Sequence, residues 1–148
     1  RLRMTWTLSQ MAPPDQLPMP VEGVRPRQVA ATFGAPRDRD RQHAGVDIFA
    51  PRGTPVRATT LGIVASIRDT GLGGRQVWVL GPGLQRHYYA HLQDWAPGLS
   101  QGDLVAPGTL LGYVGNTGNA RTTPPHLHYG VYGRQGARDP LPLLRAGH

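Results

Sequence analysis

From residue 45 onwards, apolar and polar residues alternate in short runs that turn-forming residues interrupt. Such alternation places successive side chains on opposite faces of the backbone, as in a half-buried β-strand. No segment carries the three-to-four-residue apolar spacing of a convincing amphipathic helix. We therefore predict strands within residues 45–50, 54–59, 61–69, 75–81, 84–92, 103–108, 109–115 and 127–132, with a hairpin loop at 81–83.

The first 26 residues have a different pattern, in which prolines cluster between Pro13 and Pro20 and recur at Pro26. Each proline removes a backbone donor and disfavours helical geometry at the residue before it. We therefore expect a proline-rich, extended lead-in over residues 1–26 that sustains no helix. A single folded domain is expected over residues 27–148.

The hydrophobic pattern also contains a weak internal repeat. Its first copy is Gly53, Val56, Ala58, Gly62 and Val64, and its second, with one residue inserted, is Gly102, Val105, Pro107, Gly112 and Val114. Each copy predicts a hairpin with a small residue where backbones approach closely. The expected fold is mostly β, an antiparallel β-sheet or β-sandwich of two related hairpin elements packed face to face. Biotinyl and lipoyl carrier domains have similar hairpins, but they need a lysine and this chain has none.

The amino-acid composition excludes several kinds of site and of covalent chemistry. The 148 residues fit one domain, and the absence of cysteine excludes disulfides, thiolate metal sites and a cysteine nucleophile. The formal net charge is +7 and all 16 basic residues are arginine, which suits an acidic polymer as partner but also a simple preference for arginine at the surface.

No apolar run is long enough to span a membrane. The first ten residues lack the apolar region of a signal peptide, so either an export signal was removed or the protein is cytosolic.

Two short motifs supply candidate metal ligands. His43 and Asp47 occur in HAGVD, and His126 and His128 occur in HLH. Imidazole and carboxylate are donors that a catalytic Zn²⁺ uses when three protein ligands leave a fourth position for water. The two motifs together suggest one metal site, although a surface histidine pair and a turn-capping Asp47 are the simpler alternatives.

Strand periodicity orients these side chains. In HLH, His126 and His128 share one face, about 6.5–7 Å apart, and Leu127 faces the core. One imidazole could bind an ion while its neighbour reaches the bound water. Four residues of straight strand span about 13 Å, so His43 and Asp47 can share an ion only if the chain bends, which Gly45 would permit.

Alternation along residues 87–92 predicts His87, Tyr89 and His91 on one polar face, with Tyr88, Ala90 and Leu92 on the other. His91 would thus present a further imidazole. For His87 we expect a position at the surface or at the edge of a groove. Glu22, the only glutamate, lies in the lead-in, so a glutamate base is not expected.

These motifs, in this order, resemble the lysostaphin-type or LytM-type zinc metallopeptidases, which cleave peptide bonds in bacterial peptidoglycan. The matching segments are HAGVDIFAPRGTPVRATTLGIV, YYAHL, QGDLVAPGTLLGYVGNTG and PPHLHYGVY, which span most of residues 33–132. The resemblance implies that His43, Asp47 and His128 bind one Zn²⁺ and that His91 and His126 are unligated catalytic histidines. It also implies a mostly antiparallel β fold with long loops around a groove over the metal.

The function implied is a zinc endopeptidase that hydrolyses peptidoglycan stem or bridge peptides, with a D,D-endopeptidase expected, in the periplasm or cell envelope. Two alternatives remain open. A catalytically silent module that binds the wall or activates an amidase would share the fold. A nucleic-acid-binding β domain would need arginine and aromatic residues interleaved on one face, for which Arg86 near Tyr88 and Tyr89 is a thin basis, so we expect no nucleic acid partner.

Overall fold

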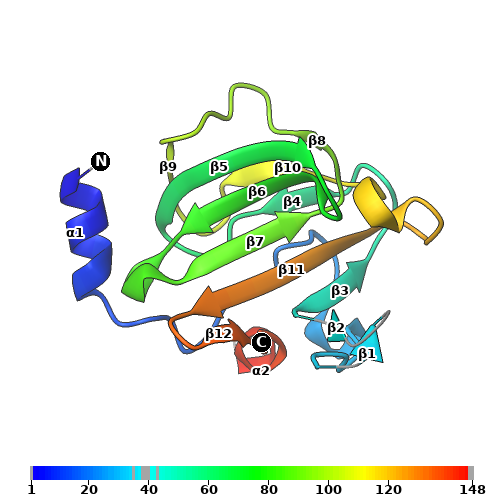
Figure 1. The fold of residues 1–148 in the computed structure, drawn as a ribbon, viewed down its shortest axis with the longest axis horizontal. Coiled ribbons are helices and arrows are strands. Elements are labelled where there is room, and N and C mark those ends of the chain that lie inside the picture. The colour runs from blue at the N-terminus through cyan, green and yellow to red at the C-terminus, as the bar shows by residue number, and fades with distance from the viewer. Residues whose placement is uncertain (1, 35, 38–40, 43, 147–148) are drawn as a thin grey trace.

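Strands dominate the structure, a computed structural model that describes residues 2–34, 36–37, 41–42 and 44–146 (Figure 1). The strands are β1 (Pro36–Arg37), β2 (Arg41–Gln42), β3 (Val46–Phe49), β4 (Pro55–Arg57), β5 (Gly62–Thr70), β6 (Gly74–Leu80), β7 (Arg86–Ala90), β8 (Leu92–Trp95), β9 (Leu104–Val105), β10 (Leu110–Val114), β11 (His126–Gly133) and β12 (Gly136–Arg138). The helices are α1 (Leu2–Gln10) and α2 (Leu141–Ala146), with 3₁₀ turns η1 (Pro26–Gln28), η2 (Pro82–Leu84) and η3 (Gly118–Ala120). The predicted mostly antiparallel β class is confirmed.

The described strands form a large sheet and a small sheet, besides a separate pair of β1 and β2. The large one has the order β12-β11-β7-β6-β5-β9, with β3 also paired to β11, and the small one has the order β4-β10-β8. Figure 1 shows β5, β6, β7 and β11 in front of β4 and β10. Apolar side chains from both sheets are buried in one core, among them Val64, Val79, Leu92, Leu111, Leu127 and Val131. Alternate residues of the large sheet therefore point away from this core and are available for a site.

The internal repeat corresponds to two interlocked elements. The Gly53 amide donates to the Val114 carbonyl, and the Gly102 amide donates to the Val64 carbonyl, each over 2.8 Å. Because of these reciprocal bonds, β4 pairs with β10 of the second copy, while β5 pairs with β9. The two related elements are present as expected, but they exchange strand partners instead of only packing face to face.

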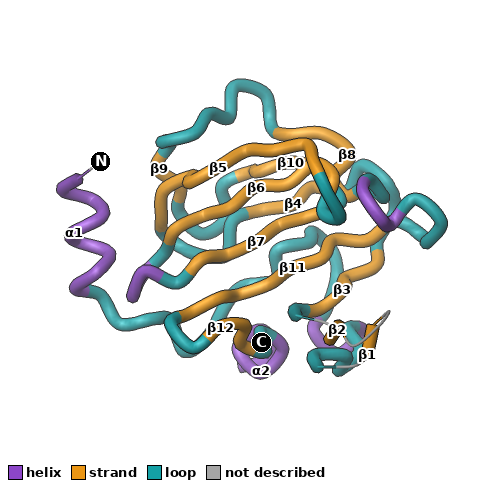
Figure 2. Tube along the Cα trace, in the orientation of Figure 1, coloured by secondary structure: helices purple, strands orange, loops and turns teal. Residues whose placement is uncertain are grey.

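The lead-in differs from the extended chain that we expected. Residues 2–10 form helix α1, since they contain no proline and the first proline follows at Pro13. Leu8 is buried, and α1 lies beside η2 at the left end of the sheet (Figure 2). Farther along, Leu17 and Val21 are buried, and Val21 forms a β-bridge with Val56. The lead-in therefore packs onto the β-structure; the boundary at residue 27 stays a prediction.

The C-terminal helix α2 was also not predicted, because its few residues are too short to show a helical period. Its leucines Leu141, Leu143 and Leu144 are buried in the common core. Over the part of the chain that the structure describes, neither α1 nor α2 is long enough to cross a membrane, and none of the other helices is.

Candidate active site and metal centre

The pairing of β3 with β11 brings the two sequence motifs together. The strands are antiparallel, with Asp47 opposite His128 and Phe49 opposite His126. The Nδ1 atom of His128 lies 3.0 Å from Oδ1 of Asp47, and Nε2 of His126 lies 3.7 Å from the same oxygen. Directly opposed side chains in a sheet are close enough for such contacts. One carboxylate thus lies between two imidazoles that are about eighty positions away in the sequence.

The alternation of HLH is confirmed. Leu127 is fully buried in the core, and His126 and His128 lie on the opposite face of β11. On β3 the same rule holds, since Val46 and Ile48 are buried while Asp47 is partly exposed. The exposed ring of Phe49 covers one side of His126, with 4.8 Å between ring centroids.

The third expected ligand, His43, lies outside the described residues. The chain does bend at Gly45, as we expected. Gly45 is also a point of close approach, because a Cβ at this position would lie 2.5 Å from the Tyr129 carbonyl oxygen and 3.0 Å from Nε2 of His128. A larger residue there would displace either the backbone of β11 or the His128 ring.

His91 reaches the site from the end of β7. Its φ of 64° is left-handed, and its amide donates to the Gly73 carbonyl over 2.9 Å. Its Nδ1 lies 2.8 Å from the Thr117 carbonyl oxygen, and its ring centroid is 5.0 Å from that of His126. A carbonyl can only accept, so Nδ1 of His91 carries the proton and Nε2 is left free to accept one.

His126 is oriented in the same way, because its Nδ1 donates to the Pro124 carbonyl over 3.0 Å. Its Nε2, the atom nearest Asp47, is then unprotonated in the neutral ring. For His91, burial lowers the pKa from 6.5 to about 4, with a smaller contribution from the nearby His126. His91 is therefore a neutral imidazole at neutral pH, and the two histidines offer two proton-accepting nitrogens beside the carboxylate.

The predicted faces of β7 are wrong in part. His87 and Tyr89 are fully buried, whereas Tyr88 lies on the site face with its ring edge-on to His128 at 5.8 Å. His91 nevertheless reaches this face, because its left-handed φ breaks the alternation after Ala90. A local two-residue period cannot show such a reversal.

The expectation that His87 is a surface or groove-edge histidine is also wrong. β7 lies between β6 and β11, so its inward-facing side chains are enclosed by the core. Nδ1 of His87 hydrogen-bonds the Tyr129 hydroxyl at 2.7 Å, and the Thr59 hydroxyl joins this group at 2.8 Å from the hydroxyls of both Tyr89 and Tyr129. Burial lowers the pKa of His87 to about 4.

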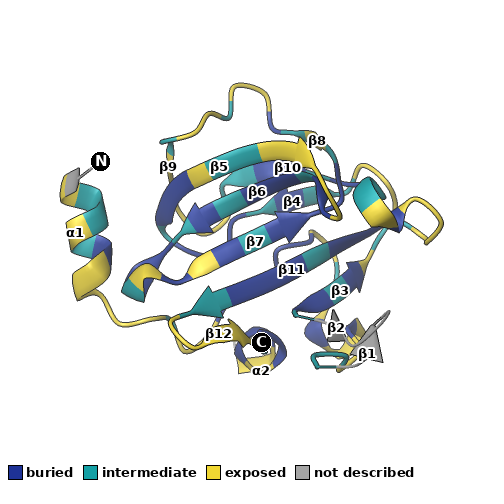
Figure 3. Cartoon of the chain, in the orientation of Figure 1, coloured by how far each residue is buried: buried dark blue, intermediate teal, exposed yellow. Residues whose placement is uncertain are grey.

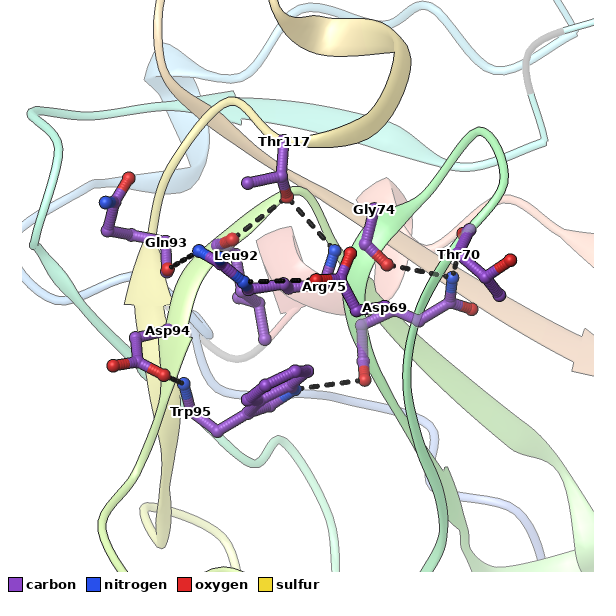
Figure 4. A network of polar contacts seen from close by, with 10 residues as sticks. Asp69, Thr70, Gly74, Arg75, Leu92, Gln93, Asp94, Trp95 and Thr117 are labelled. Atoms are coloured by element: carbon purple, nitrogen blue, oxygen red, sulfur yellow. Dashed lines mark hydrogen bonds and ion pairs between the residues drawn. The ribbon is translucent and has the colours of Figure 1, made fainter.

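Sequence reasoning missed the support of His91. The Thr117 hydroxyl donates to the Leu92 carbonyl at 2.9 Å and accepts the Arg75 amide at 3.1 Å, while the Arg75 guanidinium donates to the Gln93 carbonyl (Figure 4). These bonds fix the loop whose carbonyl holds His91. No local pattern signals this role, because the partners come from three separate segments.

A cavity of about 390 Å³ adjoins this loop. It lies between the β5–β6 turn and η3, and its lining is Asp69, Thr70, Gly71, Leu72, Gly74, Gly118, Asn119 and Arg121. Gly73, whose carbonyl accepts the His91 amide, belongs to the same turn, so this turn contacts His91 as well as bordering the cavity. It has the size of a subsite for part of a peptide.

Among the described residues, the carboxylate of Asp47 and the imidazole of His128 fit a metal ion. Ligands at about 2.0–2.2 Å from a tetrahedral Zn²⁺ lie roughly 3.3–3.6 Å apart, and Asp47 and His128 present donor atoms 3.0 Å apart. Within residues 2–34, 36–37, 41–42 and 44–146, no group of three histidine or acidic side chains is close enough to hold an ion. The third ligand that the sequence predicts, His43, is not among these residues.

Comparison with known proteins identifies curated relatives. The L-Ala--D-Glu endopeptidase of Bacillus subtilis is 40% identical over 115 residues, which cover 72% of this chain and 35% of that protein. Lysostaphin of Staphylococcus simulans is 36% identical over 110 residues, which cover 70% of this chain and 22% of lysostaphin. The chain thus spans about a third or less of the length of these relatives.

Solved structures share the fold. A putative peptidase M23 from Pseudomonas aeruginosa matches 98% of this chain and 59% of its own, with a TM-score of 0.72 and 28% identity. The catalytic domain of lysostaphin matches 79% of this chain and 91% of its own, with a TM-score of 0.69 and 31% identity. A zinc-containing peptidase from Vibrio cholerae gives a TM-score of 0.70 at 27% identity, over 86% of this chain and 39% of its own.

The model of Peptidase family M23 matches residues 41–140, which include the β3, β7, β10 and β11 segments described above. The resemblance to lysostaphin-type and LytM-type peptidases is therefore confirmed. This chain belongs to peptidase family M23.

Proposed function

We propose that this chain is a zinc-dependent endopeptidase that hydrolyses peptide bonds in bacterial peptidoglycan. The observation that carries the proposal is the Asp47 carboxylate between His128 and His126, with His91 beside them. The names of several relatives support the substrate class, among them an L-Ala--D-Glu endopeptidase and a peptidoglycan DD-endopeptidase.

In this proposal His43, Asp47 and His128 hold one Zn²⁺. The contact between Asp47 and His128 supports two of these assignments, and the HAGVD motif supports the third. When bound, the ion supplies Lewis-acid chemistry by polarising the scissile carbonyl and acidifying water.

The remaining two histidines, His91 and His126, accept and donate the proton of the attacking water. Both Nδ1 atoms are committed to backbone carbonyls, so each Nε2 can accept a proton from the attacking water. The protonated imidazole then donates this proton to the nitrogen of the departing amine. The water oxygen ends in the new carboxylate, and the C–N bond is the bond that breaks.

Two further proposals concern the peptide bond that is cleaved and the cellular location of the protein. We propose a D-Ala cross-link as the bond, in line with the DD-carboxypeptidase/endopeptidase Mpg of Neisseria meningitidis, which is 40% identical over 89 residues. The cell envelope is the corresponding location. The net charge of +7 would favour adsorption to an anionic wall polymer, an interaction that salt should weaken.

Muropeptide mass spectrometry tests the proposal. Purified sacculi are incubated with zinc-loaded protein and with its Asp47→Ala variant, and the released peptides are identified by mass. The wild type should release peptides with one new amine and one new carboxylate at a single type of bond, and the variant should release none. Intact sacculi at full zinc occupancy would contradict the proposal and favour the catalytically silent alternative.

A further inference from the structure

Aromatic side chains continue from the candidate active site along the outer face of the large sheet. The Tyr88 ring is edge-on to His128, and the Trp78 ring stacks on Tyr88 with 4.2 Å between centroids. Tyr132 follows at 5.5 Å from Trp78. Trp78, Tyr88 and Tyr132, here called the aromatic platform, are all partly exposed. They come from β6, β7 and β11, which are neighbours in the large sheet (Figure 3). The platform therefore presents a continuous surface beside the metal centre.

Arg86 closes the far end of the platform. Its guanidinium carbon lies 5.7 Å from the ring centroids of both Trp78 and Tyr132. Arg86 is exposed, and within the described part of the chain its guanidinium forms no hydrogen bond or ion pair. Stacking on two rings holds a guanidinium in place and leaves its N–H groups free to bind a carboxylate in bidentate fashion.

The sheet register gives the separation of Arg86 and His128 along the strands. His128 is opposite Ala90 and Tyr132 is opposite Arg86, so four residues of strand separate the two ends of the platform. Four residues correspond to about 13 Å, which an extended peptide covers with three or four residues. A peptide cut at the metal centre could therefore place a carboxylate at Arg86 only if that carboxylate is three or four residues from the scissile bond.

We infer that Arg86 and the aromatic platform form a subsite for a carboxylate of the substrate peptide. The inference rests on the proposed function and specifies its substrate. Stem peptides contain a γ-linked glutamate whose α-carboxylate is free, whereas a polyglycine bridge has no carboxylate along its length. The occupant is thus an acidic stem peptide that is cut at its distal cross-link, and not at the bond next to the glutamate.

Calorimetry with short ligands that lack the leaving peptide measures binding at the subsite apart from release of peptides from sacculi. The probes are two tetrapeptide amides, L-Ala-γ-D-Glu-L-Lys-D-Ala amide and the same peptide with isoglutamine in place of the glutamate. Zinc-loaded wild-type protein should bind the acidic peptide about tenfold more tightly, because only it offers a carboxylate to the guanidinium. Arg86→Gln should bind both peptides equally, and Arg86→Lys should retain part of the preference, since a lysine keeps the charge without the planar fork.

Arg145→Gln is the matched control, because it removes one exposed positive charge in α2, a helix whose leucines pack into the core. It should keep the wild-type preference. Equal binding of both peptides by the wild type, or an unchanged preference in Arg86→Gln with its circular dichroism spectrum preserved, would overturn the inference. A carboxylate preference without any hydrolysis of sacculi would instead contradict the proposed function and leave the subsite standing.

Discussion

Two groups of histidine and neighbouring polar residues occupy opposite faces of the same strands. On the outer face, His126 and His128 flank the Asp47 carboxylate, and the His91 ring lies beside theirs. On the inner face, His87 joins Thr59, Tyr89 and Tyr129 in a cluster, here called the buried polar cluster. His128 and Tyr129 are consecutive residues, so one step along β11 separates the two environments.

The comparison shows that a shifted pKa does not by itself identify a reactive histidine. Burial lowers the pKa of both His91 and His87 to about 4. The His91 ring lies beside the rings of His126 and His128, whereas Nε2 of His87 is enclosed and has no hydrogen-bond partner within the described structure. The groups that surround each ring, and not its pKa, distinguish the two histidines. The outer group should therefore control activity and the buried polar cluster should control stability.

The largest expected effect distinguishes the proposed zinc ligands from the proposed proton-transferring histidines of the outer group. His43→Ala, Asp47→Ala and His128→Ala should each lose zinc and all activity. His126→Ala and His91→Ala should keep zinc and lose roughly 10²–10⁴ in rate, the usual contribution of a positioned acid or base. Zinc content by atomic emission, measured alongside muropeptide release, checks this. A zinc-free His126→Ala together with a zinc-loaded His128→Ala would reverse the assignment within HLH.

The buried polar cluster should make stability depend on pH. His87 has a pKa of about 4 when folded and an ordinary value near 6.5 when unfolded, so the unfolded chain binds more protons between these values. Stability should be complete above pH 6.5 and fall as the pH drops towards 4, by up to about 3 kcal/mol from the difference of 6.5 and 4. Urea unfolding at several pH values measures this.

His87→Gln is the control for this pH dependence, because it removes the titrating group. Tyr89 and Tyr129, whose raised pKa values keep them neutral throughout this range, do not contribute. An equally steep loss of stability in His87→Gln would assign the effect to other groups, of which His91 is the first candidate.

A smaller effect is expected where the buried polar cluster loses one member. Thr59→Val keeps the shape of the side chain but removes hydrogen bonds to Tyr89 and Tyr129. The free energy of unfolding should fall by about 1–3 kcal/mol because buried hydroxyls lose a partner, while activity at 25 °C should stay unchanged. Thr122→Val, at an exposed threonine, should change neither quantity. A loss of activity in the folded Thr59→Val protein would show that the two faces are coupled.

The smallest effect concerns Thr117, which positions His91 without contacting the reacting atoms. Thr117→Val removes the hydroxyl bonds to Leu92 and Arg75 that fix the loop whose carbonyl accepts from His91. We expect kcat to fall about tenfold, with zinc content and Tm close to those of the wild type. Thr117→Ser should restore most of kcat, since it restores the hydroxyl. An unchanged kcat in Thr117→Val would show that the loop holds His91 without this hydroxyl.

Much of the fold could be predicted because apolar and polar residues alternate with a two-residue period in a half-buried strand, and this pattern is visible in the local sequence. The strand segments around β3 to β7 and β9 to β11 and the orientation of HLH follow from this period, whereas β8 was not predicted. The helix α1 and the burial of His87 could not be predicted in this way. They depend on contacts of α1 with distant β-elements and on the position of β7 inside the sheet.

The sequence by itself determined which side chains are available for the site and which of them share a face, since residue type and alternation are local properties. Only the tertiary structure decided that Asp47 lies opposite His128, that a left-handed residue returns His91 to the site face, and that Thr117 orients it. Each of these depends on the register or hydrogen bonding of segments far apart along the chain, and no local pattern encodes where two such segments meet.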